Sequence, residues 1–152
     1  LVVPDQIIDY TYGRESTYFD GHEKTVAHVD FTWPYSEALR QRILSAAQQA
    51  NEPLLNGGVY AALQGPRLES VAEINRYEKD GADMAGMTGM PEAALARELG
   101  VNYATIAVVV NDAAGRRSSQ GGIVLDKIGA VAQPAMERVR RILECVVECD
   151  GD

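Results

Sequence analysis

The sequence is poor in residues that bind metals or form disulfides, with two cysteines and two histidines in 152 residues. Cys145 and Cys149 lie four residues apart in a segment with helical periodicity, so they share a helix face but are poorly placed to bridge. His22 and His28 are distant from both in sequence, so no familiar set of zinc ligands is present. These absences argue against a disulfide scaffold and a metal site, and they favour reduced thiols in the cytoplasm.

Basic residues and long apolar runs are also scarce. Fourteen Lys and Arg stand against 22 Asp and Glu, which gives a formal net charge of −8 at pH 7. An acidic chain lacks the attraction that dominates nucleic-acid binding, so neither nucleic acid nor an anionic membrane is an expected partner. Residues 1–5 show neither the basic nor the apolar segment of a signal peptide. With 46% hydrophobic residues, the sequence predicts one globular domain with a buried core.

The common nucleotide-binding and hydrolase motifs are missing as well. The sequence has no G-x-x-x-x-G-K-[ST], no G-x-G-x-x-G after a strand, no H-E-x-x-H and no G-x-S-x-G. What it has is an alternation of short apolar runs and helical patterns, which is typical of an α/β fold. Strands are expected at 1–8, 59–64, 84–87 and 102–110, and helices at 34–51, 70–81, 91–100 and from 125 onward. The continuous apolar run in 102–110 predicts a strand buried on both faces.

Local signals mark three of the helix starts. Pro34 and Pro91 suit the first position of a helix, and residues 70–73 match a capping box. Residues 9–30 are polar and rich in aromatic side chains, and a loop of that length is usually functional or part of an interface. The carboxyl ends of strands are where ligands bind in open α/β sheets, which directs attention to 64–69, 87–88 and 111–113.

Three motifs in order resemble the trimeric purine nucleoside phosphorylases and methylthioadenosine phosphorylases. They are residues 65–73 (GPRLESVAE), residues 81–92 (GADMAGMTGMPE) and the strand that ends in Asn111, which lies 24 positions after Met87; residues 18–21 also fit. The resemblance implies a three-layer phosphorylase-type α/β fold with a central mixed sheet flanked by helices, assembled as a homotrimer. It also implies phosphorolysis, in which inorganic phosphate displaces a purine from C1′ of the sugar, without a metal or an organic cofactor.

The resemblance assigns roles to the first two motifs. Met87 corresponds to the residue that packs against the ribose, and Thr88 to a phosphate ligand. Leu68 matches the position that packs on the purine face. Without the motif context, Met87 and Leu68 would be read as core residues. Arg14 and Arg67 are additional candidates for attracting an anion.

Asn111 is the most informative residue, because an amide both donates and accepts hydrogen bonds. It can donate to a 6-oxo group and accept from a protonated N7 of the leaving base, which makes it the expected catalytic residue. Relatives that prefer 6-aminopurines carry one Asp at the position of Asn111 and a second Asp at the position of Ala113. Asp112, between these two positions, is also expected in the base site. Glu69 matches the acid that accepts from N1–H of hypoxanthine or guanine, although it could also complement the dipole of the helix that follows.

The sugar pocket implied by the resemblance is apolar. Leu125 falls where ordinary purine nucleoside phosphorylases have a His for the 5′-hydroxyl, and Ile128 follows one turn later. Such a wall suits a 5′-methylthio group and points to the S-methyl-5′-thioinosine branch of the family; the alternative is that both residues are helix core. His22 corresponds to a loop residue that reaches a neighbouring subunit's pocket, or it is an exposed surface residue.

Members of the family are substantially longer than this sequence. The resemblance therefore implies that residues 1–152 form the C-terminal portion of a single nucleoside phosphorylase domain that is incomplete at the N-terminus, with the main phosphate ligands before Leu1. Three alternatives stay open: an ordinary inosine or guanosine phosphorylase, a methylthioadenosine phosphorylase, and a purine-binding fragment without catalysis.

Overall fold

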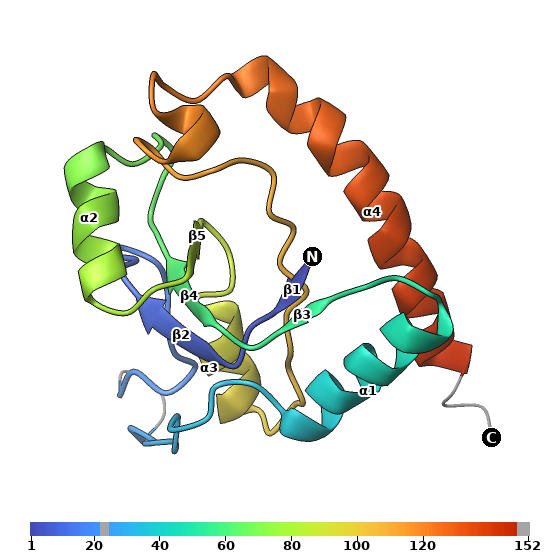
Figure 1. Cartoon of the computed structure of the whole chain (residues 1–152). Coiled ribbons are helices and arrows are strands. Elements are labelled where there is room, and N and C mark those ends of the chain that lie inside the picture. Colours follow the sequence, from blue (N-terminus) through green and yellow to red (C-terminus); the bar gives the residue numbers. More distant parts are fainter. Residues whose placement is uncertain (22–24, 149–152) are drawn as a thin grey trace.

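The computed structural model describes residues 1–21 and 25–148. Within these ranges, short strands and four α-helices alternate, which confirms the α/β prediction (Figure 1). The elements are β1 (Val2–Val3), β2 (Gln6–Asp9), α1 (Glu37–Gln49), β3 (Leu55–Asn56), β4 (Val59–Ala62), α2 (Val71–Lys79), β5 (Met84–Gly86), α3 (Glu92–Glu98), the 3₁₀ turn η1 (Arg117–Ser119) and α4 (Leu125–Glu148).

The sheet is built from two long strands, each interrupted once, and a third short strand. β1 pairs with β3 and β2 with β4, both in parallel, and the same register offset of 53 residues runs through both pairs (Val2 with Leu55, Gln6 with Val59). The interruption falls where Gly57 and Gly58 adopt φ values of +93° and +111°, which side chains disfavour. β5 adds to the other side of β4, also in parallel. The carboxyl ends of β2, β4 and β5 therefore lie at one edge.

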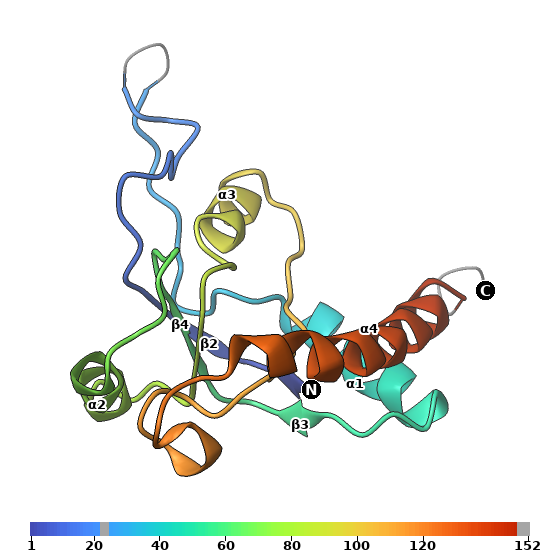
Figure 2. The same cartoon turned by 90° about the horizontal axis from the view of Figure 1, so that it is seen from above.

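Successive residues of β1 point into different cores. Val2 packs with Met90, Ala93 and other residues on the side of α3. Val3 packs with Ile43 of α1 and Ile142 of α4 on the other side. This alternation is the two-residue period of a strand, and it gives the three layers that the resemblance implies. Figure 1 shows α1 and α4 together, and Figure 2 shows α3 set apart from them.

The predicted strand at 102–110 is wrong for most of its length. Only Ala107 pairs, in an isolated antiparallel bridge with Val2 (N···O 2.9 and 2.7 Å). Val109 is 53% exposed, so the apolar run is not buried on both faces either. A strand needs a neighbour along its whole backbone, and among the described residues this segment forms a β-bridge only at Ala107, with β1.

The helix signals are confirmed in part. The capping box is present: the Ser70 side chain accepts from the Glu73 backbone N–H, and the Glu73 carboxylate accepts from the Ser70 N–H. Helix α1 begins later than expected, because Ser36 rather than Pro34 caps it. Pro91 is the N-cap of α3 rather than its first residue.

Helix α4 begins at Leu125, as predicted. Cys145 on this helix is a half-buried free thiol, and Cys149 lies outside the described residues. None of the helices in the described ranges is long and apolar enough to cross a bilayer.

Candidate active site

The chain after β4 turns at Gly65 and leads into α2. Leu68 is 37% exposed, and Glu69 is half-buried just before the N-cap residue Ser70. No described residue hydrogen-bonds to the Glu69 carboxylate, since Glu73 supplies the capping acid of the helix. Glu69 is therefore available to a ligand.

Met87 brings the end of β5 against the turn that follows β4. A Cβ placed on Gly65, whose φ is +64°, would lie 2.4 Å from the Met87 sulfur. A side chain at position 65 would be strained by this φ and would have to displace the Met87 side chain. The sugar-facing and base-facing candidates predicted from the sequence, Met87 and Leu68, thus stand at two adjoining strand ends.

Arg14 holds these two strand ends together from the long loop after β2. Its Nη2 donates to the carbonyls of Leu63 (3.2 Å), Gln64 (3.3 Å) and Met87 (3.1 Å). Its Nε donates to the Gln64 side-chain oxygen at 3.1 Å, and its Nη1 to the Met90 carbonyl. The guanidinium donors are thus used inside the protein, and the prediction that Arg14 attracts an anion is not supported.

Arg67 is also engaged within the chain. Its guanidinium donates to both carboxylate oxygens of Glu73, at 2.8 and 2.7 Å. The hydrogen bonds from Arg67, and then those from Ser70, lower the pKa of Glu73 from 4.5 to about 2. This ion pair stabilises the start of α2. The Arg67 side chain is 71% exposed to solvent.

Thr88 is exposed and contacts the phenol of Tyr60 in β4. The Tyr60 hydroxyl lies 3.3 Å from Thr88 Oγ1 and accepts the Thr88 backbone N–H at 3.4 Å. Tyr60 itself is 7% exposed. Thr88, the candidate phosphate ligand, therefore hydrogen-bonds to Tyr60, a core residue that the sequence analysis did not identify.

The third candidate segment, at 111–113, lies in a tightly bonded loop. Asn111 is half-buried and donates one amide N–H to the Asp112 carbonyl at 2.8 Å. The Asp112 carboxylate accepts from the backbone N–H (3.2 Å) and hydroxyl (2.7 Å) of Ser118, and these bonds lower the pKa of Asp112. Asp112 thus shapes the loop, while the second amide N–H and the oxygen of Asn111 have no partner among the described residues.

This loop packs against α2, the helix that follows Glu69. A Cβ on Gly115 would lie 2.8 Å from a Val71 methyl group, and Arg116 donates to Asn75 and Glu78, both at 2.7 Å. Figures 1 and 2 both show the loop beside α2. The loop that contains Asn111 is therefore a neighbour of the helix that follows Glu69. Ala113 is half-buried in this loop.

The remaining candidates lie farther away or outside the described chain. Leu125 is the first residue of α4 and is 63% exposed, so the alternative that it is helix core is wrong; Ile128 is half-buried. No described contact joins either of them to Met87. His22 lies outside the described residues.

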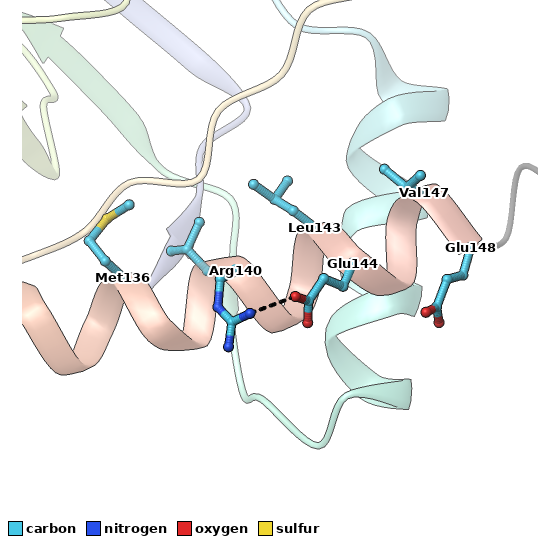
Figure 3. Close-up of a pocket in the computed structure, with 7 residues that line it drawn as sticks. Met136, Arg140, Leu143, Glu144, Val147 and Glu148 are labelled. Carbon is cyan, nitrogen blue, oxygen red and sulfur yellow. Dashed lines mark hydrogen bonds and ion pairs between the residues drawn. The ribbon is translucent and has the colours of Figure 1, made fainter.

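Two hollows elsewhere contain none of these candidates. One lies along the outer side of α4, where Met136, Leu143 and Val147 line a space of about 490 Å³ beside the Arg140–Glu144 ion pair (Figure 3). The other lies between the start of α1 and the end of α3. Within residues 1–21 and 25–148, no three His, Cys, Asp or Glu side chains gather in a way that could hold a metal ion.

Glu69, Met87 and Thr88 follow the carboxyl ends of the parallel strands β4 and β5, the edge at which open α/β sheets bind ligands. Residues 1–148 match the family model described as the phosphorylase superfamily. The chain belongs to this superfamily.

Named relatives agree with this assignment. A protein of Pseudomonas syringae pv. tomato named "Probable S-methyl-5′-thioinosine phosphorylase" is 49% identical over 145 residues, covering 95% of this chain and 58% of the relative. The 6-oxopurine nucleoside phosphorylase of Pyrococcus furiosus is 49% identical over 120 residues, covering 76% of this chain and 45% of the relative. The chain thus spans about half the length of these curated relatives.

The fold has a close match among solved structures. The methylthioadenosine phosphorylase of Schistosoma mansoni in complex with adenine superposes with a TM-score of 0.91 at 28% identity, over 99% of this chain and 59% of that one. The phosphorylase-type fold expected from the motifs is confirmed.

Proposed function

We propose that this chain is the C-terminal portion of a purine nucleoside phosphorylase domain, which transfers the sugar of a nucleoside to inorganic phosphate. The observation that carries the proposal is the half-buried Glu69 carboxylate beside the Asn111 loop, since neither Glu69 nor the Asn111 oxygen has a partner among the described residues. A carboxylate that accepts and an amide with one free donor and one free acceptor supply the groups that the edge of a 6-oxopurine needs.

Catalysis then consists of stabilising the leaving base. Phosphate forms a bond to C1′ while the bond from C1′ to the purine breaks, and negative charge develops on the purine. Water supplies the proton that N7 takes up as the charge develops; Asn111 donates to O6 and accepts from this N7–H, and Glu69 accepts from N1–H. Hydrogen bonds that strengthen as charge develops lower the barrier selectively.

Met87 and Thr88 serve the sugar and the phosphate in this proposal. The apolar Met87 thioether lies against the turn after β4, where a ribose can pack on it. Thr88 offers an exposed hydroxyl two residues beyond β5. No metal or organic cofactor takes part, and inorganic phosphate is the co-substrate.

The preferred nucleoside is S-methyl-5′-thioinosine, giving hypoxanthine and 5-methylthioribose 1-phosphate. The relatives that carry this activity in their names support the choice, as does the exposed Leu125 at the start of α4, with Ile128 one turn on. A 6-oxopurine nucleoside phosphorylase acting on inosine or guanosine is the second candidate, favoured by the relative from Pyrococcus furiosus. We further propose that the protein is a homotrimer in the cytoplasm, where it serves purine salvage. In the trimer, His22 reaches the pocket of a neighbouring subunit.

Phosphate-dependent cleavage of methylthioinosine, inosine and methylthioadenosine tests the proposal. Release of the free base is followed chromatographically with and without phosphate. We expect hypoxanthine from methylthioinosine at the highest kcat/KM, and none without phosphate. Equal or better cleavage of inosine would select the second candidate. Hypoxanthine binding without any cleavage would show a purine-binding fragment instead of an enzyme.

A further inference from the structure

The peptide group between Met87 and Thr88 is held from both sides by residues distant in sequence. Its carbonyl accepts from Arg14 Nη2 at 3.1 Å, and its N–H donates to the Tyr60 hydroxyl at 3.4 Å. The carbonyl and N–H of a trans peptide are planar and point in opposite directions. Two hydrogen bonds at opposite ends of one plane therefore fix its rotation.

The same contacts allow the Thr88 hydroxyl to act as a donor toward the solvent side. The Tyr60 oxygen already accepts the Thr88 N–H, so its own proton is free to donate to Thr88 Oγ1, 3.3 Å away. An Oγ1 that accepts this bond keeps its own proton for another acceptor. Since Thr88 is exposed, that proton is offered to the solvent side, where a phosphate oxygen can accept it.

Gly86 makes this arrangement possible. A Cβ at position 86 would lie 2.0 Å from the Tyr60 hydroxyl oxygen and 2.8 Å from Cζ. The hydroxyl therefore occupies the space of the absent side chain and reaches Thr88 from within the core. The position of the Tyr60 hydroxyl therefore depends on glycine at position 86.

We propose that Arg14 and Tyr60 are positioning residues which clamp the Met87–Thr88 peptide and orient the Thr88 hydroxyl as a hydrogen-bond donor to phosphate. The phosphate half of this inference rests on the proposed function, while the clamp rests on the contacts alone. Arg14 also holds the carbonyls of Leu63, Gln64 and Met90, so its loss loosens both strand ends. Tyr60 acts on Thr88 selectively.

The test compares two substitutions with two matched controls. Tyr60→Phe removes the hydroxyl and keeps the ring; Tyr35→Phe does the same at another buried tyrosine, whose hydroxyl makes no hydrogen bond to Thr88 in the described structure. Arg14→Lys removes the planar donor set; Arg40→Lys does so at a buried arginine that bonds the carbonyls of Val3 and Pro4, away from the site. Amide hydrogen exchange at Thr88, KM for phosphate, KM for the nucleoside and the unfolding temperature are measured for all four.

We expect Tyr60→Phe to speed exchange of the Thr88 amide and to raise KM for phosphate, each by about threefold to tenfold, with little change in KM for the nucleoside. Arg14→Lys is expected to speed exchange at residues 63–64 and 87–90 together and to raise both KM values. Tyr35→Phe and Arg40→Lys should leave Thr88 exchange and both KM values at the wild-type level, whatever they do to the unfolding temperature.

Unchanged Thr88 exchange in Tyr60→Phe would overturn the clamp. Faster exchange with an unchanged KM for phosphate would overturn the orientation of Thr88 toward phosphate. If the wild-type protein releases no purine with any nucleoside, the proposed function fails, and the clamp is then decided by amide exchange alone.

Discussion

The Tyr60 hydroxyl and Gly86 share one space: a Cβ on Gly86 would approach the phenol oxygen to 2.0 Å. Such an approach is far inside van der Waals contact, so any larger residue at position 86 must displace the Tyr60 ring or the backbone of β5. Because the ring is buried and its hydroxyl bonds Thr88, this contact joins the packing of the core to the candidate site.

Gly86→Ala is therefore expected to destabilise the protein by about 1–3 kcal/mol, the usual cost of forcing an extra methyl group into a packed core. The measurement is urea unfolding followed by circular dichroism. Adding Tyr60→Phe in the same chain should recover part of the loss, because it removes the closest atom but leaves Cζ at 2.8 Å. A Gly86→Ala variant as stable as the wild type would contradict the close contact.

Asn111→Asp should change which purine is accepted. A carboxylate has no donor for a 6-oxo group but can accept from a 6-amino group. We expect the ratio of kcat/KM for methylthioinosine over methylthioadenosine to fall by roughly 10²- to 10⁴-fold. Asn102→Asp, at an exposed position outside the candidate site, makes the same chemical change and should leave the ratio unaltered. A ratio that stays constant in Asn111→Asp would mean that another residue reads the base.

Arg40→Met should be strongly destabilising without bearing on the site. Arg40 is 5% exposed and donates to the Pro4 carbonyl at 2.8 Å and to the Asn56 side chain at 2.6 Å. An apolar replacement leaves the carbonyls of the buried Val3 and Pro4 without this donor, at a cost of about 2–4 kcal/mol in the free energy of unfolding. Arg76→Met, at an arginine that is 71% exposed, is the control and should change stability by less than about 0.5 kcal/mol.

The bond between Arg67 and Glu73 should make stability depend on acid pH. The folded pKa of Glu73, about 2, lies below the ordinary value of 4.5, so its contribution is fully present above pH 4.5 and is lost as the pH falls toward 2. Glu73→Gln removes the charge and keeps a capping side chain. The difference in unfolding temperature between wild type and Glu73→Gln should shrink across that range and be smaller in high salt, because the pair is exposed to solvent. A difference that is constant from pH 6 to pH 2 would rule out this linkage.

Local patterns in the sequence predicted the features that depend on neighbours along the chain. The Ser70–Glu73 capping box, the start of α4 at Leu125 and the strand ends at 64–69 and 87–88 all follow from spacing within one or two turns or one strand. The phosphorylase family followed from motifs of the same local kind. The start of α1 failed because Pro34 and Ser36 are both acceptable starts, and only the bond from Leu39 N–H to Ser36 decided between them.

The sequence by itself determined which residues follow β4 and β5, because hydrophobic periodicity and capping chemistry act over a few residues. Tertiary structure alone decided that Arg14 reaches Met87 across 73 positions, that Tyr60 fills the space above Gly86, and that residues 102–110 pair only at Ala107. These features depend on which backbones meet in space. A hydrogen bond between distant segments leaves no periodic trace in the sequence, so the residues that hold the candidate site in place became visible only in the folded chain.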